Sequence, residues 1–293
     1  MKLAALRAWF AVGGALAPGR VIREAADLFC TPFASTRTRA RSAPLGDARE
    51  ERVDCADAAL QLYVWGDPTR EPYVLLAHGW SSHGTRFLPW VRALRARGYA
   101  AVAFDHVAHG RSGGRRANFL LFIEGLMAVS RRFGPAAAVV GHSMGGGAAA
   151  TALARGLQAD RAVLVAPAAD LADALARFAR LTGLSEPLLR RMLAMFESTL
   201  HMRFDDLQAH RTAPCIGRPA LIVHDLADRE VPWSEGERWA RYWPQARLLS
   251  TQGLGHNRIL DDEAVIDAAL RFIDGETVGE RVVSTPALPF GFA

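Results

Sequence analysis

Short, continuous apolar runs that alternate with helical stretches constrain the fold of this chain more than any other feature. They occupy residues 73–77, 99–104, 136–140, 162–166, 219–224 and 246–249. A strand that is buried on both faces has such a run, whereas a half-exposed strand alternates apolar and polar residues. The stretches between the runs have helical spacing, as in 87–97, where Leu88, Val91 and Leu94 share one face. The pattern predicts an α/β fold, with a mostly parallel sheet, helices on both faces and right-handed crossovers.

Two stretches depart from this rhythm. Residues 53–65 read as one or two edge strands, and the turn Gly66-Asp67-Pro68 follows them. Residues 168–217 contain no apolar run, only amphipathic helical sequence, which is typical of a helical cap over the carboxyl edge of the sheet. We therefore expect an N-terminal helical segment (1–50), an α/β core (51–168 and 217–275), a helical cap (169–216) and an irregular C-terminal tail (276–293).

Composition excludes several classes of protein. The 293 residues include 35 basic and 30 acidic ones, and the basic residues are scattered without forming a block. A specific nucleic-acid surface is therefore not expected. The three cysteines, Cys30, Cys55 and Cys215, are an odd number without CxxC or Cys/His metal spacing. This argues against a disulfide framework and favours buried thiols in the reducing cytoplasm.

The N-terminus has some features of a signal peptide. Two positive charges in residues 1–7 precede an apolar run over 8–17. Glycines inside this run and Pro18 directly after it make secretion the less favoured interpretation, and the run is too short to span a bilayer. We expect a helix that packs on the domain or rests peripherally on a membrane surface. The residues expected near one face of this helix are Leu3, Leu6, Phe10 and Leu16.

The heptapeptide GHSMGGG joins the apolar run 136–140 to an alanine-rich helical stretch. Gly141, Ser143 and Gly145 form G-x-S-x-G in a strand–turn–helix setting, where the turn forces the serine into a strained conformation. Side chains two residues before or after the serine would clash in such a turn, so glycine is needed at both places. The motif predicts that Ser143 is a nucleophile; a flexible Gly/Ser loop is the alternative.

A serine hydroxyl needs a base, and the base needs an orienting acid. In sites of this kind the three residues follow one another along the chain in the order serine, acid, histidine. Asp228 follows the run 219–224, and His256 follows the run 246–249 in a glycine-rich loop. Both are expected at carboxyl ends of strands, so we predict the triad Ser143, Asp228 and His256. Asp225 competes with Asp228 for the acid role, although it lies immediately after its strand.

The oxyanion formed by attack on a carbonyl needs backbone N–H donors. One is expected from Met144, directly after the nucleophile, and the other from Trp80 in the loop HGWSSHG after Tyr73–Ala77. Only main-chain atoms are required, so the side chains of these two residues are expected to be pocket walls.

At this point the chain resembles the α/β-hydrolase superfamily, in its cap-bearing branch of serine esterases, lipase-like enzymes and serine aminopeptidase-like members. The resemblance covers residues 73–260 and rests on LLAHGWSSHG, FDHVAHGRSGG, VVGHSMGGGAA, LIVHDLADREVP and GLGHNRIL. The resemblance implies a family loop D-x-x-G-H-G-x-S, in which Ala108 replaces the usual glycine. Asp105, His109 and Ser112 are then expected to shape that loop. Branches with an aspartate nucleophile are disfavoured because Ser143 holds that place.

These observations favour a serine hydrolase that cleaves a carboxylic ester through an acyl-enzyme. A thioesterase, lactonase or amidase/peptidase with the same triad, and a non-catalytic binding module on this fold, are alternatives. No cofactor is implied. A metal site is not expected because no metal-binding spacing accompanies the histidines near two strand ends, His78, His83, His106 and His109.

The substrate is expected to be a small ester-like molecule with an apolar acyl or aromatic part. This rests on apolar cap residues, which could instead simply pack the cap: Phe178, Leu181, Met192, Met195 and Phe196. Arginines in the cap and in GGRRAN could favour an anionic substrate, but solvated helix faces explain them better. The oligomeric state is left open.

Overall fold

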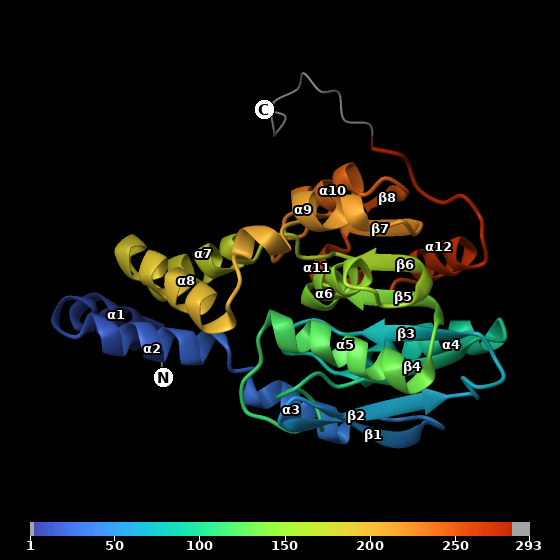
Figure 1. Cartoon of the computed structure of the whole chain (residues 1–293), viewed down its shortest axis with the longest axis horizontal. Coiled ribbons are helices and arrows are strands. Elements are labelled where there is room, and N and C mark those ends of the chain that lie inside the picture. The colour runs from blue at the N-terminus through green and yellow to red at the C-terminus, as the bar shows by residue number, and fades with distance from the viewer. Residues whose placement is uncertain (1–2, 283–293) are drawn as a thin grey trace.

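The computed structural model describes residues 3–282, which form an eight-stranded sheet with helices on both faces (Figure 1). The strands are β1 (Arg49–Cys55), β2 (Ala58–Trp65), β3 (Tyr73–Ala77), β4 (Ala100–Phe104), β5 (Ala136–His142), β6 (Ala159–Val165), β7 (Ala220–Asp225) and β8 (Ala246–Thr251). Their order is β1-β2-β4-β3-β5-β6-β7-β8. β2 pairs antiparallel with β1 and β4, and the six strands from β4 to β8 in this order are parallel. The predicted fold class is confirmed.

The sheet has a hydrophobic layer on each face because successive side chains of a strand point to opposite sides. In β3, Leu75 and Ala77 pack on one side with α5 (Phe119–Phe133), α6 (Met144–Ala154) and α10 (Trp233–Tyr242). Val74 and Leu76 pack on the other side with α4 (Leu88–Ala96) and α12 (Glu263–Ile273). All five residues of β3 are buried. Burial on both faces is the physical reason for the continuous apolar runs in the sequence.

A separate helical unit lies beyond the carboxyl ends of β3 and β6 in Figure 1. It combines α1 (Leu3–Leu16) and α2 (Pro18–Phe29) with α7 (Leu171–Thr182) and α8 (Glu186–Leu200), from the stretch between β6 and β7. Phe29 of α2 packs against Phe178 and Phe196, at ring-centroid distances of 5.3 and 6.1 Å. Met192 is fully buried in the same cluster. Four of the five apolar residues named for the predicted cap therefore belong to the cluster formed with the N-terminal helices, whereas Leu181 is 57% exposed.

The face predicted for the first helix is partly wrong. Leu6 and Phe10 are buried, but Leu3 is 45% and Leu16 is 81% exposed. Gly13 is the third buried residue of α1, and a Cβ there would come within 3.0 Å of the Val21 side chain and 3.2 Å of the Trp9 ring. Periodicity alone favoured leucine over glycine for the buried face. None of the helices within residues 3–282 is long and apolar enough to cross a membrane.

The helix α3 (Ala34–Ser42) returns from the helical unit to the sheet. Arg37 holds it there by donating to the carbonyl oxygens of Gly110, Gly114 and Ser112 at 3.4, 3.0 and 2.7 Å.

The remaining short helical segments are η1 (Gly84–Phe87), η2 (Phe204–Leu207), α9 (Ala209–Thr212), η3 (Ala213–Cys215) and α11 (Gly255–Arg258). The first strand starts at Arg49, two residues before the predicted start of the core, because β1 pairs with β2 from this residue onward.

The cysteines and the C-terminal tail differ in part from expectation. All three cysteines are free, but only Cys55 is buried; Cys30 is half-buried and Cys215 is exposed. Glu280, within the stretch predicted as an irregular tail, forms an antiparallel bridge to Leu248 of β8 through two backbone hydrogen bonds of 2.7 and 2.8 Å. The rest of that tail, residues 283–293, lies outside the described residues.

Candidate active site

Ser143 lies in a sharp turn between β5 and α6. Its φ is +54° and its ψ is −124°, a conformation that costs a non-glycine residue energy. Its backbone N–H donates to Val165 O at 2.9 Å, which anchors the turn to β6. A Cβ on Gly141 would come within 2.6 Å of Gly145 O, and one on Gly145 within 2.3 Å of His78 O. The neighbouring backbone therefore excludes side chains at both positions.

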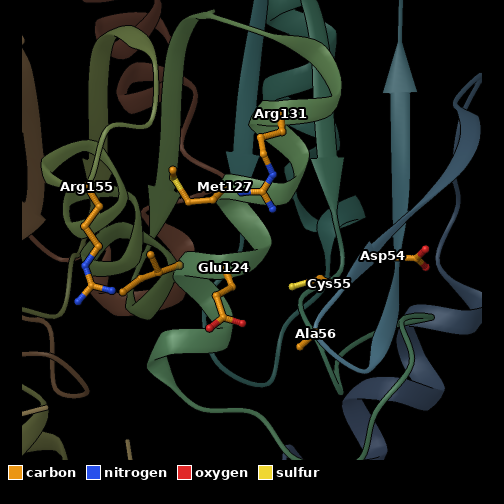
Figure 2. A pocket seen from close by; sticks show the side chains of 8 residues that line it. Asp54, Cys55, Ala56, Glu124, Met127, Arg131 and Arg155 are labelled. Carbon is orange, nitrogen blue, oxygen red and sulfur yellow. The ribbon is translucent and has the colours of Figure 1, made fainter. Parts of the chain in front are cut away.

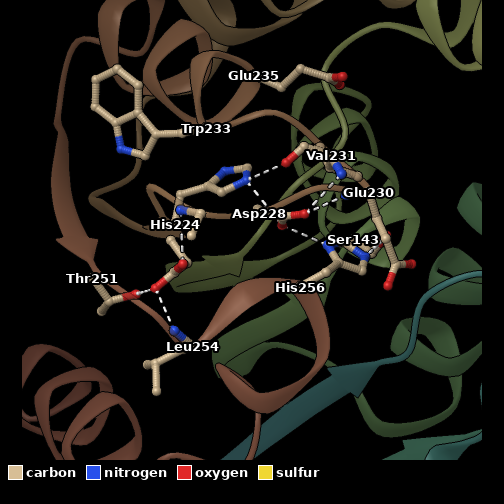
Figure 3. A network of polar contacts seen from close by, with 12 residues as sticks. Ser143, His224, Asp228, Glu230, Val231, Trp233, Glu235, Thr251, Leu254 and His256 are labelled. Carbon is tan, nitrogen blue, oxygen red and sulfur yellow. Dashed lines mark hydrogen bonds and ion pairs between the residues drawn. The ribbon is translucent and has the colours of Figure 1, made fainter.

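Three side chains from three strand ends meet at this turn. His256, on α11 after β8, has its Nε2 3.0 Å from the Ser143 Oγ and its Nδ1 2.7 Å from the Asp228 Oδ2. Asp228 lies in the loop after β7. An ionised carboxylate only accepts hydrogen bonds, so Nδ1 carries the imidazole hydrogen and Nε2 is free to accept the serine hydroxyl. The arrangement gives the serine a base that a carboxylate orients (Figure 3).

The Asp228 carboxylate is buried but fully hydrogen-bonded. Its Oδ1 accepts from the backbone N–H groups of Glu230 and Val231 at 2.8 and 2.9 Å. Burial raises the pKa of Asp228, but hydrogen bonds from His224 and His256 outweigh burial and hold that pKa well below its ordinary value. Asp228 is therefore ionised throughout the neutral range and keeps the orientation of His256.

His224 is a second histidine on the same carboxylate, at the end of β7. Its Nε2 is 3.0 Å from Val231 O and 3.4 Å from Asp228 Oδ2, and both are acceptors, so Nε2 carries the hydrogen (Figure 3). Its Nδ1 has no hydrogen-bond partner among the described residues. A Cβ on Gly236 would come within 2.3 Å of that nitrogen, so this glycine makes room for the ring.

Asp225 has a different set of contacts from Asp228. Its Oδ2 accepts from the Thr251 hydroxyl at 2.8 Å and from Leu254 N–H at 3.0 Å, and its Oδ1 accepts from Ala227 N–H at 2.9 Å. These bonds tie together the two loops that carry Asp228 and His256. The competing acid candidate thus contacts the backbone of the histidine loop, while Asp228 contacts the imidazole itself.

The loop after β3 lies directly against Ser143. A Cβ on Gly79 would come within 2.9 Å of the Ser143 Cβ. Ser81 has a φ of +51°, and its N–H donates to His109 Nε2 at 3.0 Å. His109 Nδ1 in turn donates to Val107 O at 2.9 Å. Burial lowers the pKa of His109 to about 3, so the ring stays neutral and keeps a nitrogen free to accept from the loop.

The stretch DHVAHGRS folds into a tight loop around Asp105. The carboxylate accepts from Tyr63 Oη and from the N–H groups of Gly84 and Arg111, each at 2.7 Å. Ser112 Oγ donates to Asp105 O at 2.5 Å. Ala108 has a φ of +64°, which explains why glycine is the usual residue at this place in the resembling motif.

A pocket of about 700 Å³ opens at Ser143 and His256. Its walls come from the loop after β3, the loop after β7, the start of α11, and α3. The lining residues are Phe33, Thr36, Arg39, Gly79, Trp80, Ser81, Ser82, His83, Arg86, His142, Ser143, Glu230, Val231, His256 and Asn257.

The lining differs from the sequence expectation in two ways. No residue of the predicted cap belongs to it. Trp80 is a wall as predicted, but the Met144 side chain packs against the core instead.

A second hollow, of about 390 Å³, lies where the turn between β1 and β2 meets α5 (Figure 2). Cys55, Glu124 and Arg131 line it, and burial raises the pKa of Cys55 to about 11. A protonated thiol is a poor nucleophile, so Cys55 is not a reactive thiolate in this hollow. Within residues 3–282, no three His, Cys, Asp or Glu side chains are grouped so that they could hold a metal ion.

Comparison with known proteins agrees with this architecture. A sequence model of the family described as serine aminopeptidase, S33 matches residues 68–213. The structure is similar to an esterase from Exiguobacterium antarcticum, with a TM-score of 0.62 and 16% identity, over 78% of this chain and 100% of that one. A bacterial membrane phospholipase A is similar with a TM-score of 0.61 and 19% identity, over 93% and 96% of the two chains. These similarities show that the chain has the α/β-hydrolase fold.

Among curated proteins, a monoacylglycerol lipase from Mycolicibacterium smegmatis is 36% identical over 94 residues. That match covers 29% of this chain and 33% of the lipase, so it spans about a third of the relative's length.

Sequence reasoning missed three parts of the site. His142, adjacent to Ser143, is buried, and its Nε2 is 2.9 Å from His256 O, so it also fixes the histidine loop. His224 gave no signal beyond its place at a strand end. No sequence pattern predicted that α3 lines the pocket, because nothing in residues 1–50 indicates that the chain returns to the carboxyl edge of the sheet.

Proposed function

We propose that the protein is a serine hydrolase that cleaves carboxylic esters of small molecules. The observation that carries this proposal is the chain of contacts Ser143 Oγ to His256 Nε2 at 3.0 Å and His256 Nδ1 to Asp228 Oδ2 at 2.7 Å. A serine with a positive φ, mounted at the start of a helix beside such a base, fits nucleophilic catalysis.

In the proposed reaction, the Ser143 Oγ attacks the ester carbonyl carbon while His256 Nε2 takes the hydroxyl proton. The tetrahedral intermediate collapses, the C–O bond to the alcohol breaks, and His256 returns the proton to the departing alcohol oxygen. Water then attacks the acyl-enzyme while His256 Nε2 takes a proton from it. The bond between the acyl carbon and the Ser143 Oγ breaks, His256 returns the proton to this oxygen, and the carboxylic acid leaves. Asp228 keeps the imidazole oriented and stabilises its transient positive charge. Acyl transfer in this form uses only groups of this chain and water.

The N–H groups of Met144 and Trp80 are proposed to stabilise the oxyanion. The Met144 N–H is the first of α6, so no carbonyl one turn earlier in the helix accepts it. The close approach of Gly79 to Ser143 brings the loop that carries Trp80 beside the nucleophile. Two donors on different loops are the usual construction of such a hole.

The relatives support an ester as the substrate class. The similar curated protein is a monoacylglycerol lipase, and the similar structures include an esterase and a phospholipase A. The apolar part of the substrate would contact Phe33, Trp80 and Val231, the large apolar side chains of the pocket. This replaces the sequence argument from the cap, whose apolar residues pack on α1 and α2.

Hydrolysis of p-nitrophenyl esters of increasing chain length tests this proposal. Wild type is expected to release p-nitrophenol, and Ser143→Ala is expected to be inactive. Ser82→Ala is a matched control, because Ser82 lines the same pocket without contacting the triad. An inactive wild type, or equal losses in the two variants, contradicts the proposal.

We further propose that α1 rests on a membrane surface. Val12 and Leu16 are 60% and 81% exposed, and Arg7 is the one exposed charged residue of this helix within Leu3–Leu16. An exposed helix face of alanine, valine and leucine is more stable in a lipid headgroup region than in water. Co-sedimentation with phospholipid vesicles is expected for wild type and is expected to weaken in Leu16→Glu. Leu226→Glu, at another exposed leucine, is the control and should leave binding unchanged.

A further inference from the structure

We propose that the pocket selects esters that carry an anionic group, carboxylate or phosphate, and that Arg39 on α3 binds this group. The inference rests on the proposed function and deepens it by naming the substrate class. Its basis is a guanidinium group that lines the pocket and is not engaged by any other described part of the chain.

The arginines of α3 differ in what they contact. Arg37 donates to three backbone carbonyls of the Asp105 loop and holds the helix in place. Arg39, two residues further on, lines the pocket together with Thr36 and Phe33. Within residues 3–282 its side chain has neither a hydrogen bond nor an ion pair. A cationic donor without a partner at a pocket wall is suited to a ligand anion, because guanidinium binds carboxylate and phosphate in the same bidentate way.

The position of this wall is fixed relative to the nucleophile. The Phe33 N–H donates to Ser81 Oγ at 3.0 Å, which links the start of α3 to the loop that lies against Ser143. Thr36 is buried, and its hydroxyl donates to Phe33 O at 2.6 Å. Arg39 is therefore mounted on a held helix at the pocket that contains the scissile bond. Burial lowers the pKa of His83 in the pocket lining, and the positive charges of Arg86 and Arg39 lower it further.

The other charges of the pocket orient an anion toward α3. Arg86 is already paired, since it donates to Asp261 Oδ2 at 2.6 Å and to Asn257 O at 3.2 Å. Glu230, on the wall formed by the loop after β7, accepts from Asn257 Nδ2 at 2.7 Å and is an acidic residue of the pocket lining. A substrate anion is repelled by Glu230 and attracted by Arg39. The arginines of GGRRAN line a different hollow, with Thr31.

The test uses two pairs of esters, and in each pair one ester carries an anionic group that the other lacks. The carboxylate pair is p-nitrophenyl hydrogen glutarate and p-nitrophenyl methyl glutarate. The phosphate pair is monobutyrylglycerol 3-phosphate and monobutyrylglycerol. For each pair the measured quantity is the ratio of kcat/KM for the anionic ester to that for the neutral one.

Wild type is expected to favour the anionic ester of at least one pair, and the pair with the larger ratio identifies the anion. In Arg39→Gln this ratio is expected to fall about tenfold, with kcat/KM for the neutral ester unchanged within about twofold. Arg41→Gln is the matched control, because Arg41 lies on the same helix, is exposed and is absent from the pocket lining.

Three results would overturn the inference: ratios below one in wild type for both pairs, a ratio that Arg39→Gln leaves unchanged, or equal falls in Arg39→Gln and Arg41→Gln. Hydrolysis of the neutral esters without charge selectivity refutes the inference alone. Failure to hydrolyse any of the four esters refutes the proposed function instead, so the two failures are distinguishable.

Discussion

The two walls of the Ser143 pocket hold their polar side chains in different ways. On the wall built from strand ends, His256, Asp228 and His142 all have hydrogen-bond partners within the chain, and all are buried. On the α3 wall, Arg39 is exposed and has no side-chain partner among the described residues. Groups that must keep one geometry through a reaction are pre-organised by the core, whereas a group that binds a ligand is left unsatisfied.

The largest expected effect separates the two acids of the strand-end wall. Asp228→Asn is expected to lower kcat/KM for p-nitrophenyl esters about a thousandfold, because an amide favours the wrong tautomer of His256. Asp225→Asn is the control at a neighbouring carboxylate that contacts the histidine loop rather than the ring, and we expect a loss of only about tenfold. Thermal unfolding of both variants checks that they remain folded. Equal losses in the two folded variants would contradict the assignment.

Stability toward acid is expected to depend on the buried histidines at or after the carboxyl ends of β3, β4 and β5. Burial lowers the pKa of His78, His109 and His142 to about 3 and that of His106 well below 6.5. Between pH 6.5 and about 3 the unfolded chain therefore binds more protons than the folded one, and stability falls as the pH falls. Each such histidine adds to this loss of stability as the pH falls below 6.5.

Urea unfolding at pH 7.5, 6.5 and 5.5 measures this dependence. Asp228 acts in the same direction at lower pH, since its lowered pKa gives stability that is present above about pH 4 and is lost as the pH falls further. His106→Leu should flatten the dependence, because both ring nitrogens of His106 lack partners among the described residues. Equal slopes for His106→Leu and wild type would show that these histidines do not govern acid stability.

A smaller effect is expected from His224, which donates to the Asp228 carboxylate. His224→Leu removes the donor 3.4 Å from Asp228 Oδ2 and is expected to lower kcat/KM about tenfold. His224→Gln keeps an N–H at a similar place and should recover most of the activity. If Gln and Leu variants of equal thermal stability lose equal activity, then His224 only fills space beside Gly236.

The smallest expected effect loosens the α3 wall without touching the strand-end wall. Arg37→Gln removes three donors to backbone carbonyls and is expected to reduce the preference for anionic esters about threefold. Neutral esters should be hydrolysed at the wild-type rate within about twofold. A parallel fall for both kinds of ester would show that α3 supports catalysis as well as recognition.

The comparison of the two walls also shows what the sequence could predict. The sheet was predictable because burial on both faces leaves continuous apolar runs, as in β3 and β5. The positions of Ser143, Asp228 and His256 at strand ends followed from the same runs, since parallel strands bring their carboxyl ends to one edge. These are local signals, each contained within about ten residues.

The α3 wall depends on contacts that no local pattern encodes. Arg39 and Arg41 are both arginines of one short helix, and tertiary contacts such as the hydrogen bonds of Arg37 to residues 110–114 determine which of them lines the pocket. The packing of Phe178 and Phe196 on Phe29 likewise joins segments about 150 residues apart. Sequence periodicity identified these residues as apolar but not the element they would bury against.

The most direct test of the account is to map the site of a covalent adduct. Wild-type protein treated with a fluorophosphonate and digested should yield one modified peptide, with the adduct on Ser143, and Asp228→Asn should react far more slowly. A protein that forms no adduct, or one whose adduct lies on another residue, would contradict the claim that Ser143 is the activated nucleophile.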